Sequence, residues 1–114
     1  MERDFVEKLK ELLDISRSVE QELELKGLKS TAPEIGIIKE QLFRTTLPSL
    51  VGACQAMARG EPTERAEIRL KRDLPAAISG LEKIKQTPQG KQMVAQLDRI
   101  RALVDYVQNE YPKI

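Results

Sequence analysis

Residues 93–111 read MVAQLDRIRALVDYVQNEY, and their apolar pattern decides the fold class. Apolar side chains recur there at alternating steps of four and three residues, namely at Met93, Leu97, Ile100, Val104, Val107 and Tyr111. This spacing places the apolar side chains on one face of an α-helix. The segment therefore predicts a helix with one buried face, which Pro112 ends.

The first part of the chain, from about residue 4 to residue 26, carries a similar stripe. Its members are Phe5, Leu9, Leu12, Ser16, Val19 and Leu23. Asp4, with Glu7 three residues later, is the expected N-cap, and Gly27 is the expected stop after the helix. Thr31 and Glu34 have the spacing of a capping box for a second helix.

Two more helical segments fill the middle of the chain. The second helix is expected from about residue 32 to residue 59, where Gly60 in the stretch GEP is the expected stop. The third helix is expected from about Pro62 to residue 86. Thr87 and Pro88 then have the pattern of an N-cap and a first helical residue. Segments of similar length joined by short loops predict an all-α, antiparallel up-down-up-down four-helix bundle, with residues 1–114 as a single domain.

Two prolines interrupt the middle helices in matching contexts, TTLPSLVGA at residues 45–53 and RDLPAAISG at residues 72–80. Proline inside a helix removes a backbone donor and clashes with the preceding turn. Either each helix restarts, with Thr46 and Asp73 as caps, or each helix bends at Pro48 and Pro75. Both prolines lie at nearly the same height in the expected hairpin. The bends either curve the helices around the core or open a groove for a partner.

A compact array of shorter helices is an alternative architecture. Prolines recur every 13 to 15 residues through the middle of the chain, at Pro33, Pro48, Pro62, Pro75 and Pro88. Proline favours the first turn of a helix, so each one could begin a separate short helix.

The composition argues against most catalytic and metal chemistry. The chain has no histidine, one cysteine, and a net charge of +1. Without imidazoles or paired thiols, the usual zinc, haem and di-iron sites cannot form. Glu20, Glu22 and Glu24 read as a solvated acidic edge, and Cys54 as a small core residue. We expect no catalytic residue, no metal and no cofactor, and hence not an enzyme.

A basic face on the third helix is the alternative site. Its candidate nucleic-acid contacts are Arg65, Arg69, Lys71 and Arg72. Basic side chains at this helical spacing can follow backbone phosphates. However, Glu61–Arg65 and Glu67–Lys71 also have the spacing of ordinary ion pairs on a helix surface. No aromatic residues lie among the bases to stack on nucleotides.

These features favour a non-enzymatic helical interaction module, such as a small adaptor, assembly factor or regulator. The expected partner contacts are Leu47, Pro48, Leu50, Leu74 and Pro75 near the prolines, and Leu103 and Tyr106 as exposed apolar residues of the last helix. Broad apolar faces on the first and last helices also suggest a homodimer through these two helices. The longest uncharged run, 14 residues from Thr45 to Ala58, is too short to cross a bilayer. With no visible signal segment, we expect no membrane association and a cytoplasmic location.

Overall fold

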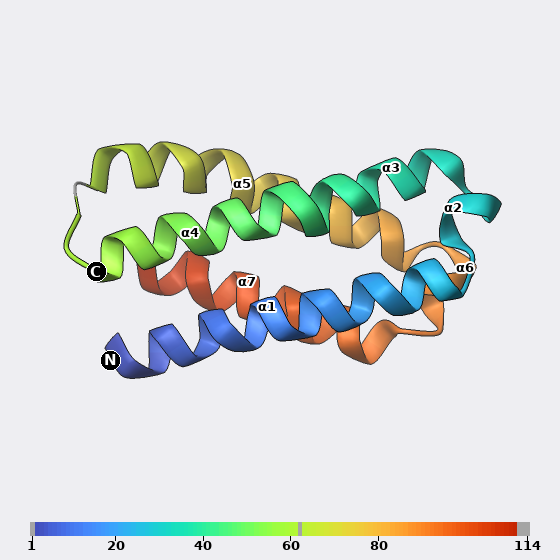
Figure 1. Ribbon diagram of the computed structural model, residues 1–114, viewed down its shortest axis with the longest axis horizontal. Coiled ribbons are helices and arrows are strands. Elements are labelled where there is room, and N and C mark those ends of the chain that lie inside the picture. The colour runs from blue at the N-terminus through green and yellow to red at the C-terminus, as the bar shows by residue number, and fades with distance from the viewer. Residues whose placement is uncertain (1, 62, 112–114) are drawn as a thin grey trace.

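The computed structural model describes residues 2–61 and 63–111, and these residues form helices and no strand (Figure 1). The all-α prediction is confirmed. The helices are, in chain order, α1 (Glu2–Leu25), α2 (Leu28–Thr31), α3 (Pro33–Gln41), the π-helix η1 (Leu42–Thr46), α4 (Leu47–Ala58), α5 (Thr63–Lys85), α6 (Pro88–Lys91) and α7 (Val94–Glu110).

The long helices run along the long axis of the molecule, and the short helices α2 and α6 lie at one end (Figure 1). The principal-axis extents are 43 × 23 × 18 Å. Helix α4 packs on α5 and α1, and α7 packs on α1 and α5. Because the chain contains both long and short helices, the four-helix bundle and the array of shorter helices fit it equally well. No described helix has both the length and the apolar character needed to cross a bilayer.

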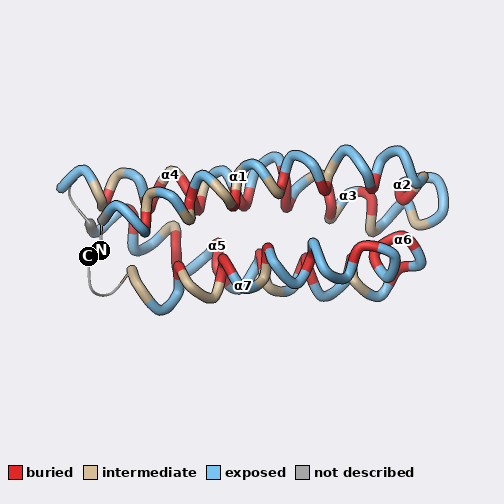
Figure 2. The backbone as a smooth tube through the Cα atoms, turned by 90° about the horizontal axis from the view of Figure 1, so that it is seen from below, coloured by how far each residue is buried: buried red, intermediate tan, exposed pale blue. Residues whose placement is uncertain are grey.

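Both apolar stripes face the core, where buried residues line the inner sides of the helices (Figure 2). Every member of the α1 stripe is at most 4% exposed. Its one polar member, Ser16, donates its hydroxyl hydrogen to the Leu12 carbonyl at 2.6 Å, so its burial leaves no donor unpaired. From Met93 to Val107 the second stripe is at most 1% exposed, whereas Tyr111 is half-buried. Removing these side chains from water holds α1 and α7 together.

Glycine and threonine end or begin the helices as the sequence predicts at three places. Gly27 and Gly60 have φ angles of 77° and 79°, which glycine adopts without strain. Thr87 caps α6, because its Oγ1 accepts the Gly90 amide at 3.0 Å. A β-carbon at Gly90 would lie 1.9 Å from the Ile84 carbonyl oxygen, so only glycine fits against the end of α5.

Two of the expected caps are wrong. Helix α1 begins at Glu2, so Asp4 lies inside the helix. Thr31 does not cap α3; its hydroxyl donates to the Gly27 carbonyl at 2.8 Å, and Ala32 is the N-cap without a side-chain bond. The expectations for Pro62 and Pro112 lie outside the described residues.

Candidate functional site

The chain passes Pro48 without breaking its helix. The π-helix η1 comes immediately before α4, and the Leu47 amide bonds to the Leu42 carbonyl five residues earlier. The backbone at Thr46 and at Leu47 is helical, with φ and ψ of −66° and −54° and of −66° and −44°. This wider turn places Pro48 in the first turn of α4, where a missing amide hydrogen costs little. The restart capped by Thr46 is therefore wrong, because Thr46 makes no side-chain cap bond.

Pro75 is accommodated differently. It lies inside α5, which continues from Thr63 to Lys85. The expected restart is wrong here as well, because Asp73 does not cap a helix. The Asp73 side chain is buried and accepts a hydrogen bond from Nε of Arg72 at 3.0 Å. This bond, and then the charge of Asp73, raises the pKa of Arg72.

Two arginines of α5 bind the turn of α4 that contains Pro48. Arg69 donates to the Ser49 carbonyl at 2.8 Å and to its hydroxyl at 3.3 Å. Arg72 also donates to the Ser49 hydroxyl, at 3.3 Å. Gly52 leaves room for this contact, since a β-carbon there would lie 3.1 Å from Nη2 of Arg69. These bonds bring Ser49, next to Pro48, beside the turn of α5 that precedes Pro75.

Two side chains of the expected basic face therefore make intramolecular hydrogen bonds. Arg69 and Arg72 bind α4, whereas Arg65 and Lys71 have no hydrogen-bond or ion-pair partner among the described residues. The expected ion pairs of Glu61 with Arg65 and of Glu67 with Lys71 do not form. Glu61 instead pairs with Arg59, at 2.7 Å.

A groove lies between α5 and α7, beside Pro75. We call it the α5 groove; it has a volume of about 480 Å³ and is lined by Lys71, Leu74, Pro75, Ile78, Ser79, Gln108 and Tyr111. Leu74, which is 5% exposed, is its one buried lining residue, whereas Pro75 is exposed and Ile78 and Tyr111 are half-buried. Ile68 is 64% exposed and lies seven residues before Pro75, on the same face of α5. The apolar surface therefore extends along α5 beyond the groove.

A smaller hollow of about 200 Å³ lies on the other side of α5, against α3 and η1. Leu42 and Thr46 line it from η1, and Ala76 and Gly80 from α5. This is the place at which the sequence suggests a groove between the two proline-containing helices. The α5 groove is larger, and a further hollow of about 460 Å³ lies between α4 and α5, lined by Ala56, Glu61, Glu64, Arg65, Ala66 and Arg69.

Four of the expected partner contacts belong to the hydrophobic core: Leu74, which also borders the α5 groove, and three further leucines. Leu47 and Leu50 are 0% exposed and Leu103 is 1% exposed, so they offer no surface in this conformation. The prediction that Leu103 is exposed is wrong, because it points into the same core as the α7 stripe. Tyr106 is half-buried, with its ring centroid 6.2 Å from that of Phe5. Burial is the main cause that raises its pKa.

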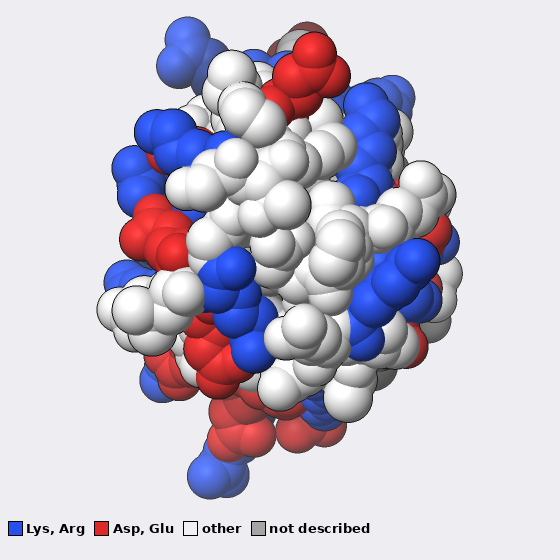
Figure 3. Space-filling view, turned by 90° about the vertical axis from the view of Figure 1, so that its right-hand side faces the viewer, with Lys and Arg blue, Asp and Glu red and all other residues white. Residues whose placement is uncertain are grey.

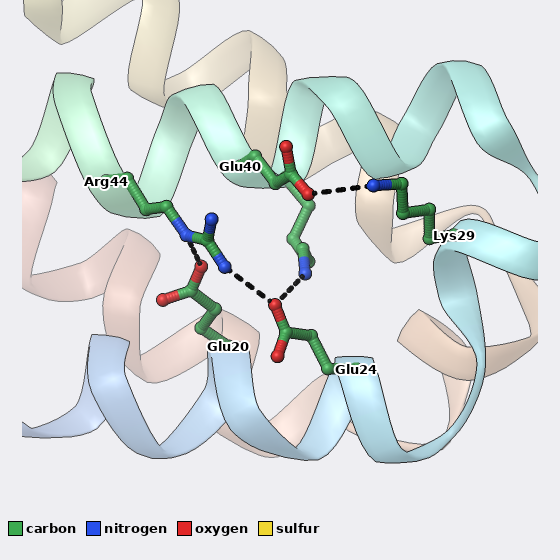
Figure 4. A network of polar contacts seen from close by, with 6 residues as sticks. Glu20, Glu24, Lys29, Glu40 and Arg44 are labelled. Carbon is green, nitrogen blue, oxygen red and sulfur yellow. Dashed lines mark hydrogen bonds and ion pairs between the residues drawn. The ribbon is translucent and has the colours of Figure 1, made fainter.

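The carboxylates of α1 form a polar network with α3 and η1 (Figure 4). Arg44 donates to Glu20 at 2.8 Å and to Glu24 at 2.9 Å, and Lys39 donates to Glu24 at 3.0 Å. Lys39 is 1% exposed, and its hydrogen bond is the largest cause that lowers the pKa of Glu24. Glu20 and Glu24 therefore form ion pairs that link α1 to α3 and η1. The expectation of a solvated acidic edge is wrong for Glu20, whose side chain is 17% exposed, whereas Glu24 remains 46% exposed. No group of three or more Cys, Asp or Glu in the described part of the chain could hold a metal ion.

The end of the molecule that carries α2 and α6 has an uncharged centre with charged side chains around it (Figure 3). Gln89 of α6 donates its amide to the Thr31 hydroxyl at 2.8 Å, which ties α6 to α2. Its Oε1 atom is buried and has no hydrogen-bond partner among the residues that the structure describes. At the end of α1, Leu25 is 87% exposed. None of the pockets described above includes this end.

Comparisons of the chain with protein-family models, with curated proteins and with solved structures each returned no match.

Proposed function

We propose that the protein is a non-enzymatic helical interaction module, a small cytoplasmic adaptor, assembly factor or regulator that binds a partner protein through the α5 groove. The observation that carries this proposal is the apolar surface of Leu74, Pro75, Ile78 and Tyr111, continued along α5 by the exposed Ile68. Grooves of this kind bind the apolar face of a partner helix. Leu74 and Pro75 remain partner contacts in this proposal, and we further propose an up-down-up-down bundle as the scaffold.

The only cysteine thiol supports a binding role over a catalytic one. Cys54 is 0% exposed, and burial raises its pKa to about 12. A thiol that stays protonated and enclosed is a poor nucleophile. Among the described lining residues of the α5 groove, Lys71 is the one charged side chain, and the others are apolar or neutral.

Affinity capture with a matched pair of variants tests the proposal. Ile68 and Ile37 are 64% and 63% exposed, on α5 and α3 respectively, so serine at either position removes a similar apolar surface. We expect Ile68→Ser to lose the specific partner that the wild-type protein captures from its native lysate, and Ile37→Ser to retain it. Equal capture by both variants would contradict a role for the α5 surface.

The same experiment tests the nucleic-acid alternative. Capture is repeated after nuclease treatment and with Arg65→Glu. If the partner is lost under both conditions while Ile68→Ser still captures it, the result would favour nucleic-acid binding by the basic face. We expect neither treatment to matter, because Arg69 and Arg72 already bind α4.

A homodimer through α1 and α7 is part of the proposal. A hollow of about 290 Å³ between these helices is lined by Ile15, Ser18, Val19, Ala95, Gln96 and Arg99. Val94, next to it in sequence, is 36% exposed. A second copy of the chain that covered this apolar surface would remove it from water and so stabilise a dimer. Light scattering coupled to size exclusion is expected to give twice the chain mass of 12.9 kDa at high micromolar concentration, and a monomer would contradict it.

A further inference from the structure

Of the described residues that line the α5 groove, Lys71 is the one with a charged side chain. It is exposed and has no hydrogen-bond or ion-pair partner among the described residues. Its neighbour Arg72 is different, because Asp73 accepts its Nε hydrogen at 3.0 Å. Across the groove, α7 contributes the neutral side chains of Gln108 and Tyr111. In the described part of the chain, the groove therefore combines an apolar floor with a single positive charge that no described residue neutralises.

The apolar surface has the length of a short helix. Ile68, Lys71, Pro75 and Ile78 follow one another at steps of three, four and three residues, so they form a line along one face of α5. From residue 68 to residue 79 this line extends about 16 Å, which is about three helical turns. A partner helix lying along this line would place one residue from the edge of its apolar face near Lys71. Its apolar residues before and after that position would contact the apolar side chains of α5.

The groove is too open to enclose a small molecule. Lys71, Pro75, Ser79 and Gln108 are all exposed, and Leu74 alone among the lining residues is buried. Small-molecule sites usually surround most of the surface of their ligand. A helix needs only one side covered, so the shape favours a helical partner.

We infer that the occupant of the α5 groove is an amphipathic helix with a carboxylate that pairs with Lys71, an inference that rests on the proposed function. Apolar residues of the partner helix cover Leu74, Pro75 and Ile78, and its Asp or Glu side chain neutralises Lys71. Opposite charge at this position selects among partners more than it strengthens binding, because the pair remains near water.

Three synthetic peptides that differ at one residue test this inference. Each is a leucine-rich amphipathic helix of about 18 residues, long enough to form a helix in isolation. The central residue at the edge of the apolar face is Glu, Gln or Lys. Titration of the isotope-labelled full chain, followed by NMR, is expected to shift amide signals of residues 68–79, 108 and 111. The Glu peptide should bind about threefold more tightly than the Lys peptide at low salt, and this ratio should fall toward one as salt screens the pair.

Variants of Lys71 identify the charge responsible. Lys71→Met keeps the apolar stem and should abolish the difference between the peptides, whereas Lys71→Glu should reverse their order. Arg65→Met is the matched control, since it removes a positive charge from α5 outside the groove and should leave the ratio unchanged. If all three peptides shift the groove signals with equal affinity, the inference about charge fails and the proposed function stands. If no peptide shifts these signals, both fail.

Discussion

Pro48 and Pro75 lie in nearly matching sequence contexts, but the structure accommodates them in different ways. Before Pro48, the turn widens into the π-helix η1, and the following α4 residues Leu50 and Val51 are at most 2% exposed. Pro75 lies inside the continuous helix α5, with its ring exposed and the half-buried Ile78 beside it. Both prolines are exposed, but Pro48 is followed by buried residues of α4, whereas Pro75 lines an open groove.

The difference shows that a proline motif does not determine its own surroundings. Leu47 and Leu74 each come one residue before a proline, and both are buried. Beyond the prolines, α4 has contacts with α1 and α5, so most of its faces are covered. The outer face of α5 has no such neighbour, and the exposed Ile68 and Pro75 lie there. An adaptor can use such a surface, because covering it does not require the core to open.

The largest expected difference between the two regions comes from apolar truncation. Leu50→Ala removes a fully buried side chain next to Pro48 and should lower the free energy of unfolding by about 3 kcal/mol. Ile78→Ala removes a half-buried side chain next to Pro75 and should cost about 1 kcal/mol. Chemical denaturation measures both values. Equal losses would mean that Ile78 belongs to the core and does not line an open groove.

Replacing each proline by alanine should raise the free energy of unfolding, but by different amounts. Inside a helix, proline costs about 3 kcal/mol relative to alanine, and its restriction of the unfolded chain offsets up to about 1 kcal/mol. Pro75→Ala should therefore raise the free energy of unfolding by about 2 kcal/mol. Pro48→Ala should raise it by less than about 1 kcal/mol, because η1 already places Pro48 in a first turn. Thermal and chemical denaturation provide the measurements, and a larger gain at Pro48 would contradict this account of η1.

Arg69 links the two regions, and its removal should have an intermediate effect. The half-buried guanidinium donates to the Ser49 carbonyl at 2.8 Å. Arg69→Met keeps most of the stem but loses this bond, so it should lower the free energy of unfolding by about 1 kcal/mol. Arg65→Met is the control and should change it by less than about 0.5 kcal/mol, because Arg65 is exposed and has no partner among the described residues. Equal effects of the two substitutions in denaturation would exclude a stabilising role for the Ser49 contact.

Regular features of the fold could be predicted from sequence because they depend on local spacing. The stripes of α1 and α7, the stops at Gly27 and Gly60, and the Thr87 cap each follow from residues close together in the chain. The π-helix η1 could not be predicted in this way. A single π-helical turn does not change the spacing of apolar residues in a recognisable way. The sequence around Pro48 therefore fits a bend and a restart of the helix equally well.

The proposed binding surface was harder to predict because it depends on which faces other helices cover. Lysine side chains are mostly exposed in proteins, yet Lys39 pairs with Glu24 of α1 and is only 1% exposed. Arg69 and Arg72 read as a basic face, yet Ser49 of α4 accepts their hydrogen bonds. Ile68 could have been found, since its seven-residue spacing from Pro75 places both opposite the buried side of α5.

The smallest expected effect separates a continuous helix from a restart at Pro48. If Thr46 capped a new helix, replacing it would cost about 1 kcal/mol. In the structure, the Thr46 side chain makes no cap bond and is 8% exposed. Thr46→Val, which keeps the shape of the side chain, should therefore change the free energy of unfolding by less than about 0.5 kcal/mol. Thr87→Val is the matched control: it removes a hydroxyl that caps α6 by accepting the Gly90 amide, and it should cost about 1 kcal/mol. A loss at Thr46 as large as that at Thr87 would mean that the helix restarts at Pro48 in solution, and the two prolines would then differ less than the structure indicates.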